Sequence, residues 1–129
     1  MSITHRRFFA TLLAIVLAAP GTAQVQRQFP QNALRGQIVF AQPPQIALNG
    51  EIKRLAPGAR IRGTNNMIVL SGSLVGSSEA VHFTIDPEGQ IRDVWILRPE
   101  ELANLPWPST AKEAEAWSFD PIAQRWTKP

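Results

Sequence analysis

The sequence predicts a mainly β domain, a small antiparallel barrel or curled sheet of five to six strands with one or two short C-terminal helices. Three features support this prediction. Short runs of β-prone residues recur between positions 34 and 97, and turn residues such as Asn-Gly and Asp-Pro-Glu-Gly separate them. Helix-start patterns then follow at Pro99 and Thr110. The order of the strands and the oligomeric state stay open at this level.

Residues 1–23 have the pattern of a cleavable secretory signal peptide. A positive segment that contains Arg6 and Arg7 precedes an apolar run over 8–19, and small residues at 21–23 provide a cleavage site. The apolar run is shorter than the roughly 20 residues that a membrane-spanning helix needs. We therefore predict export to the periplasm, no transmembrane segment after cleavage and a single mature domain over 24–129, with 24–32 as a loose N-terminal arm.

The first predicted strand covers 34–41, where Gly36, Ile38 and Phe40 share one face by period-two alternation. Pro43 and Pro44 end it, because two consecutive prolines donate no ladder hydrogen bonds.

A hairpin is predicted over 45–55 around Asn49-Gly50, the pair that best tolerates the two positive φ angles of a type I′ turn. The two-residue loop pairs Leu48 with Glu51, Ala47 with Ile52 and Ile46 with Lys53. Because apolar and charged residues then oppose one another, we expect the hairpin at the rim of the sheet.

Turns, strands and two short helices are also predicted over 57–117. Pro57-Gly58 predicts a type II turn, and the continuous apolar run 67–70 predicts a strand buried on both faces. A second hairpin is expected over 80–97, with Val81, Phe83 and Ile85 facing inward. Short helices are predicted from Pro99 to about Asn104, and from a capping box at Thr110 and Glu113 to about Trp117.

The charge is divided between the two halves of the mature chain. Arg6 and Arg7 account for two of the 13 basic residues, so the mature chain carries 11 bases against 10 acids, a formal net charge of +1. Residues 24–62 hold six bases and one acid, whereas 79–129 hold nine acids and five bases. We expect the halves to attract each other, and the near-neutral total argues against a nucleic-acid partner.

Two groups of residues are candidate binding sites. The first is a basic patch made of Lys53, Arg54, Arg60 and Arg62. The second is an aromatic cluster made of Trp95, Trp107, Trp117 and Trp126. For the tryptophans, packing of the tail against the sheet is the main interpretation, and an aromatic groove for a sugar or a peptide is the alternative.

The residues give little support for catalysis. His82 is the only histidine after cleavage, and no Gly-x-Ser-x-Gly motif surrounds the nearby serines, which are Ser71, Ser73, Ser77 and Ser78. Without cysteine, one imidazole makes no typical zinc site. Asp86, Glu88 and Asp93 lack the spacing of a calcium loop, and the chain has no phosphate-binding loop. We predict no enzyme, no metal and no cofactor.

Four segments carry a resemblance: Asn-Ala-Leu-Arg-Gly at 32–36, the run 54–63, Asn-Asn-Met at 65–67 and Val-Trp-Ile-Leu at 94–97. Through them the chain resembles a group of small exported proteins of Gram-negative bacteria with no assigned function. A shorter likeness, over 81–97, the Thr110 helix and Trp-Ser-Phe-Asp-Pro at 117–121, is to the C-terminal domains of TonB-type energy-transducing proteins. Neither likeness implies an activity.

Three functional hypotheses follow. The first is a non-catalytic periplasmic module that binds a protein or envelope component or takes part in envelope assembly. The alternative is electrostatic attachment to anionic lipid or lipopolysaccharide through the basic patch. A small hydrolase that uses His82 is the third.

Overall fold

The computed structural model describes residues 25–129, so the predicted signal peptide lies outside the described residues. The strands are β1 (Leu34–Gln42), β2 (Gln45–Leu48), β3 (Glu51–Arg62), β4 (Ser78–Ile85), β5 (Ile91–Ile96), β6 (Ser118–Asp120) and β7 (Arg125–Thr127). The helices are α1 (Pro99–Leu102), α2 (Ala111–Ala116) and the 3₁₀ turn η1 (Ser71–Leu74). No helix among the described residues is long and apolar enough to cross a membrane.

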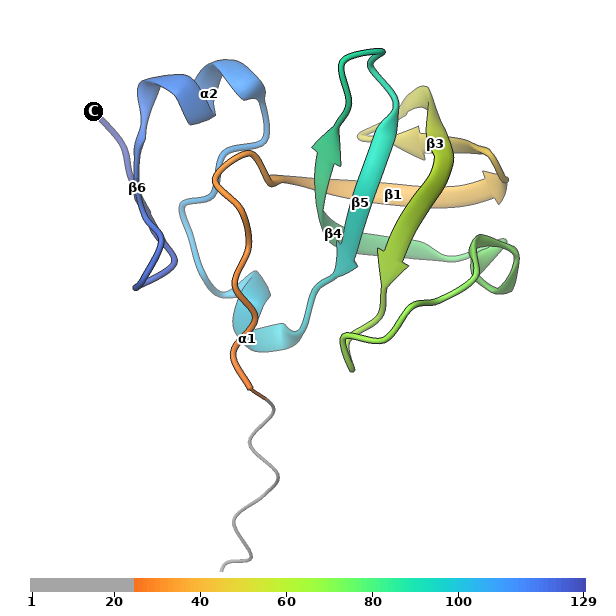
Figure 1. Cartoon of the computed structure of the whole chain (residues 1–129), viewed down its shortest axis with the longest axis horizontal. Coiled ribbons are helices and arrows are strands. Elements are labelled where there is room, and N and C mark those ends of the chain that lie inside the picture. The colour runs from red at the N-terminus through yellow and green to blue at the C-terminus, as the bar shows by residue number, and fades with distance from the viewer. Residues whose placement is uncertain (1–24) are drawn as a thin grey trace, which may run out of the picture.

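The strands β1 to β5 form a closed barrel in the order β1-β2-β3-β5-β4, and β6 and β7 form a separate two-stranded sheet (Figure 1). The predicted mainly β fold with short C-terminal helices is confirmed. One barrel pair, β3 with β5, is parallel, and the others are antiparallel. This connectivity is that of the five-stranded Greek-key barrel called the OB fold. A fold alone assigns no ligand, because one fold serves many functions.

The hairpin between β2 and β3 forms as predicted. Asn49 and Gly50 have φ angles of 51° and 83°, and all three predicted residue pairs are present. Its predicted rim position is wrong, because Ile46 and Leu48 are buried in the barrel core. The strand β2 closes the barrel between β1 and β3, so its apolar face turns inward.

The predicted turn at Pro57-Gly58 is also wrong, because β3 runs through it without a break. Gly58 has a φ of +76°, and the register with β5 is irregular between Leu55 and Arg60. The first half of β3 pairs with β2 and the second half with β5. The proline and the glycine thus make a bend that transfers the strand from one neighbour to the other.

The apolar run 67–70 is not a buried strand. A single antiparallel bridge joins Ile68 to Arg62, and only Val69 packs against the core. Met67 and Leu70 are 66% and 77% exposed. The run lies along the edge of β3 opposite β5 and is not one of the five strands of the closed barrel.

A second layer covers one side of the barrel. The N-terminal arm lies between the barrel and the C-terminal tail, which contains both helices and the β6–β7 sheet (Figure 1). The arm is anchored and not loose, because Arg27 and Phe29 are each 6% exposed. Phe29 belongs to a second apolar cluster with Ala33, Leu97, Trp107 and Trp126. Both predicted helix starts are present, and Thr110 Oγ1 accepts a hydrogen bond from Glu113 N at 3.1 Å.

Candidate functional site

A transverse row of paired residues crosses the outside of the barrel. Its members, in order across β1, β4, β5, β3 and the segment after β3, are Arg35, His82, Trp95, Arg62 and Ile68. Directly paired residues project from the same face of a sheet. The arm and the tail cover the part of the row around His82.

His82 lies beneath this cover and is 1% exposed. Its ring stacks on Trp107 with a centroid distance of 4.2 Å and meets the edge of Phe29 at 4.5 Å. Trp107 is itself held by a hydrogen bond from its Nε1 to the Ala33 carbonyl, at 2.9 Å. The period-two alternation that places Val81 and Phe83 inside predicts His82 on the outer face of β4. The face is as predicted, but the arm and the tail bury it.

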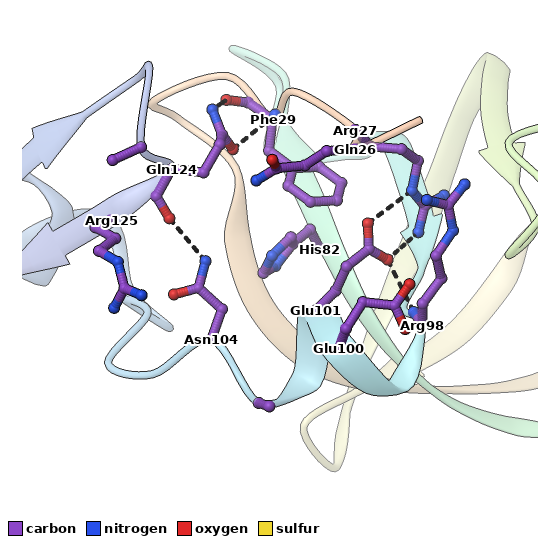
Figure 2. A pocket seen from close by; sticks show the side chains of 12 residues that line it. Gln26, Arg27, Phe29, His82, Arg98, Glu100, Glu101, Asn104, Gln124 and Arg125 are labelled. Carbon is purple, nitrogen blue, oxygen red and sulfur yellow. Dashed lines mark hydrogen bonds and ion pairs between the residues drawn. The ribbon is translucent and has the colours of Figure 1, made fainter. Parts of the chain in front are cut away.

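An ion pair between Arg27 and Glu101 holds the arm to α1 (Figure 2). Arg27 Nε donates to Glu101 Oε2 at 2.9 Å, and its Nη2 also contacts Glu101 Oε1. Further bonds run from Arg27 to the carbonyls of Gly63 and Ile96, and Glu101 accepts the backbone N–H of Arg98. This pair joins the base-rich first half to the acid-rich second half, as the charge distribution predicted.

A cleft of about 520 Å³ lies beside this ion pair, between the arm, α1 and the β6–β7 turn (Figure 2). His82 and Phe29 form its inner wall. On one side Asn104 Nδ2 donates to the Gln124 carbonyl at 2.7 Å, and Gln124 Oε1 accepts the Phe29 N–H at 2.9 Å. These bonds give the cleft a fixed polar wall. Glu100 and Arg125 bring charges of opposite sign to its outer part.

The His82 ring has an unusual electrostatic position. Burial lowers the pKa of His82 to about 2, and the positive charges of Arg35 and Arg27 also lower it, while a backbone hydrogen bond with Leu34 raises it. The ring is therefore neutral at physiological pH. Its Nδ1 is buried and has no hydrogen-bond partner. A neutral ring in this position can offer a hydrogen bond to a bound molecule, but it is a poor acceptor of protons.

Three of the four serines that the hydrolase hypothesis considers make hydrogen bonds elsewhere. Ser73 and Ser77 donate to the carbonyls of Leu70 and Leu74, and Ser78 Oγ accepts from Gln37 Nε2. No contact in the described residues links a serine hydroxyl to His82 Nδ1.

Asp86 and Asp93, two of the three acids that lack the spacing of a calcium loop, also have local roles. Asp86 Oδ1 accepts the N–H groups of Glu88 and Gln90 within its own turn, and Asp93 pairs with Arg62 at 3.7 Å. Residues 25–129 contain no cluster of side chains suited to a metal ion.

The four predicted basic residues do not form one patch. Lys53 and Arg54 are adjacent on β3 and so project to opposite faces, and the bend at Pro57-Gly58 separates them from Arg60 and Arg62. Arg60 and Arg62 do share the outer face, as the period-two pattern predicted.

The four predicted tryptophans all lie in or against the second apolar cluster. Trp107 and Trp126 are buried, whereas Trp95 and Trp117 are partly exposed. Packing of the tail is therefore the structural role of this group. An aromatic groove stays a prediction for the exposed edges of Trp95 and Trp117.

Sequence reasoning missed Arg27, Phe29 and Glu101. The two members of the ion pair are 74 positions apart, so no local pattern marks them as partners. Comparisons with protein-family models, with curated proteins and with solved structures found no match to this chain.

Proposed function

We propose that this protein is a non-catalytic binding module of the periplasm, and that the cleft beside His82 holds a small zwitterionic ligand such as an amino acid or a dipeptide. One observation carries the proposal: His82 lines an open cleft with polar walls, and its buried Nδ1 has no hydrogen-bond partner. Leaving a buried polar group unpaired costs about 1–3 kcal/mol, so such groups in native proteins call for an explanation. A ligand that bonds to Nδ1 would remove this cost.

The size and the charges of the cleft suggest the ligand class. A volume of about 520 Å³ lies within the range of small-molecule sites. Arg125 and Glu100 lie on opposite sides of the opening, with His82 and Asn104 between them (Figure 2). A carboxylate would bind Arg125 and an ammonium group would bind Glu100, because each forms a charge-assisted hydrogen bond. A ligand with a single charge would leave one of the two wall charges without a partner.

The test uses the imidazole as its own reporter. His82 is the only histidine after His5, so histidine labelling gives one ring signal in the exported protein. A panel of free amino acids and dipeptides is added, and the ring nitrogen resonances are followed by NMR. We expect one class of zwitterion to shift the Nδ1 signal, and we expect His82→Phe to abolish binding while keeping an aromatic ring in the stack.

Charge variants test the two ends of the ligand. Arg125→Gln and Glu100→Gln should each weaken binding by roughly tenfold, the range of one charge-assisted bond. Lys112→Gln, on the exposed side of α2, is the matched control and should have no effect. If no zwitterion moves the signal and Nδ1 is found bonded to a buried water, the histidine is structural and the proposal fails.

A further inference from the structure

The proposed zwitterionic ligand has to reach a side chain that is closed to solvent. His82 lines the cleft, but it is 1% exposed, and its unpartnered Nδ1 is buried. A molecule can bond to that nitrogen only if part of the cover over the ring moves. Trp107 and Phe29 provide this cover, and their rings contact the His82 ring at centroid distances of 4.2 Å and 4.5 Å.

Trp107 is the fixed part of the cover. Its Nε1 donates to the Ala33 carbonyl at 2.9 Å, and the carbonyl of the neighbouring Pro108 accepts the backbone N–H of Arg35 at 2.8 Å. These two bonds join the tail to the N-terminal end of β1. Trp107 is also not among the residues that line the cleft. A movement of Trp107 would therefore break bonds to the barrel on a side that the cleft does not reach.

Phe29 is the part of the cover that borders the cleft, and one side chain holds its backbone. Gln124 Oε1 accepts the Phe29 N–H at 2.9 Å, and Gln124 Nε2 donates to the Phe29 carbonyl at 3.3 Å (Figure 2). Within the described chain, no other hydrogen bond reaches residues 28–29. The arm is fixed on either side of them, by the ion pair of Arg27 and by the turn at 30–33.

Gln124 has an unfavourable backbone conformation where it makes this contact. Its φ of 55° lies in the left-handed region, which residues other than glycine rarely adopt. The residue is 2% exposed, and its Nε2 also donates to the Pro121 carbonyl at 2.9 Å within the same turn. Backbone strain of this kind persists where surrounding contacts hold it, and it is concentrated at ligand clamps and switches.

We infer that Phe29 is the gate of the His82 cleft and that Gln124 is the latch that keeps it closed. When the two bonds to Gln124 open, the Phe29 ring turns away while Arg27 and the 30–33 turn keep the arm in place, and His82 Nδ1 is exposed to the cleft. Closure over a bound zwitterion restores the bonds and shields the ligand from water, so the latch controls the rates of entry and release. The ligand in this scheme rests on the proposed function, whereas the gate itself does not.

Chemical labelling of the single imidazole tests the gate without a ligand. Diethyl pyrocarbonate transfers an ethoxycarbonyl group to a neutral imidazole nitrogen, and His82 is the only histidine after His5. The protein is purified after export and labelled at neutral pH, and mass spectrometry of the peptide that contains His82 gives the rate. Opening of the gate exposes little surface, so we expect a rate that does not change at low urea concentrations, where the protein stays folded.

Two variants remove the latch in different ways. Gln124→Met keeps the volume of the side chain but loses its polar atoms, and Gln124→Gly also relieves the left-handed backbone. Each removes both bonds to Phe29, so each should raise the labelling rate by at least roughly tenfold. Asn66→Gly is the matched control, because Asn66 has a φ of 65° and an exposed side chain with no hydrogen bond in the described chain. This control should label as the parent does.

Labelling and ligand binding are tested separately. A labelling rate that neither Gln124 variant raises, or one that rises with urea in step with complete unfolding, overturns the gate. If a zwitterion binds, its association rate should rise in Gln124→Met, and an unchanged association rate overturns the gate while the proposed function stands. If no zwitterion binds but both variants label faster than the parent, the gate is supported and the proposed function fails.

Discussion

Acid should destabilise this protein through His82. In the folded state burial lowers the pKa of His82 to about 2, whereas an unfolded histidine has a pKa of about 6.5. As the pH falls below about 6.5, the unfolded chain binds a proton that the folded ring rejects, so the free energy of unfolding decreases. Between about pH 7.5 and pH 4.5 the loss from this residue is about 2.7 kcal/mol. The whole interval lies well above the folded pKa, so the folded protein binds almost no proton at His82, and proton binding by the unfolded chain is what lowers the stability.

The assay is urea unfolding followed by tryptophan fluorescence across this pH range, on the parent protein and on His82→Phe. Phenylalanine keeps a ring between Phe29 and Trp107 but carries no titrating nitrogen. The two proteins share every other titrating group, so the difference between their unfolding free energies isolates the imidazole. We expect that difference to change by about 2.7 kcal/mol in favour of the variant as the pH falls. Parallel curves would show that His82 is hydrated or protonated in the folded protein and would refute the reasoning.

Three further predictions concern packing and are measured by urea unfolding at neutral pH. Glu101→Gln leaves the buried Arg27 without its carboxylate and should lower the free energy of unfolding by about 3–5 kcal/mol. Arg27→Met with Glu101→Leu should recover most of that loss. A small loss for Glu101→Gln alone would show that the ion pair does not hold the arm to α1. Gly36→Ala should lower the free energy of unfolding by about 1–3 kcal/mol, because the new Cβ would lie 2.9 Å from Phe83 Cε1. An unchanged stability would mean that the Phe83 ring can move away. Trp107→Phe removes the 2.9 Å bond to the Ala33 carbonyl and should lower stability by at least about 1 kcal/mol, with retained stability pointing to water as a substitute partner.

The local elements of the barrel were predictable because their causes are local. Period-two alternation placed Ile38 and Phe40 inside, and the Asn49-Gly50 turn specified both its own geometry and the pairing of β2 with β3. The errors arose where the environment of a residue depends on distant segments. Pro57-Gly58 has the composition of a turn, but the closed barrel uses it as a bend within β3.

The candidate site was predictable only in part. His82 was singled out as the sole histidine of the mature chain, and the period-two pattern gave the correct face for it. Its burial was not predicted, because the Phe29 and Trp107 side chains that cover it come from segments on either side of the barrel sequence. The exposure of Ile68 and Leu70 was likewise not predictable, since an apolar run has the same composition inside a core and on a surface.

The sequence alone determined which residues of β1 face the core, where the Asn49-Gly50 hairpin turns, where the helices start and how charge is divided along the chain. These properties follow from backbone sterics and from side-chain chemistry within a few neighbouring residues. The tertiary structure decided which face of the barrel is covered, which arginine meets which acid and which apolar residues remain exposed. Those outcomes depend on contacts between distant segments, such as Arg27 with Glu101, and such contacts leave no local pattern in the sequence.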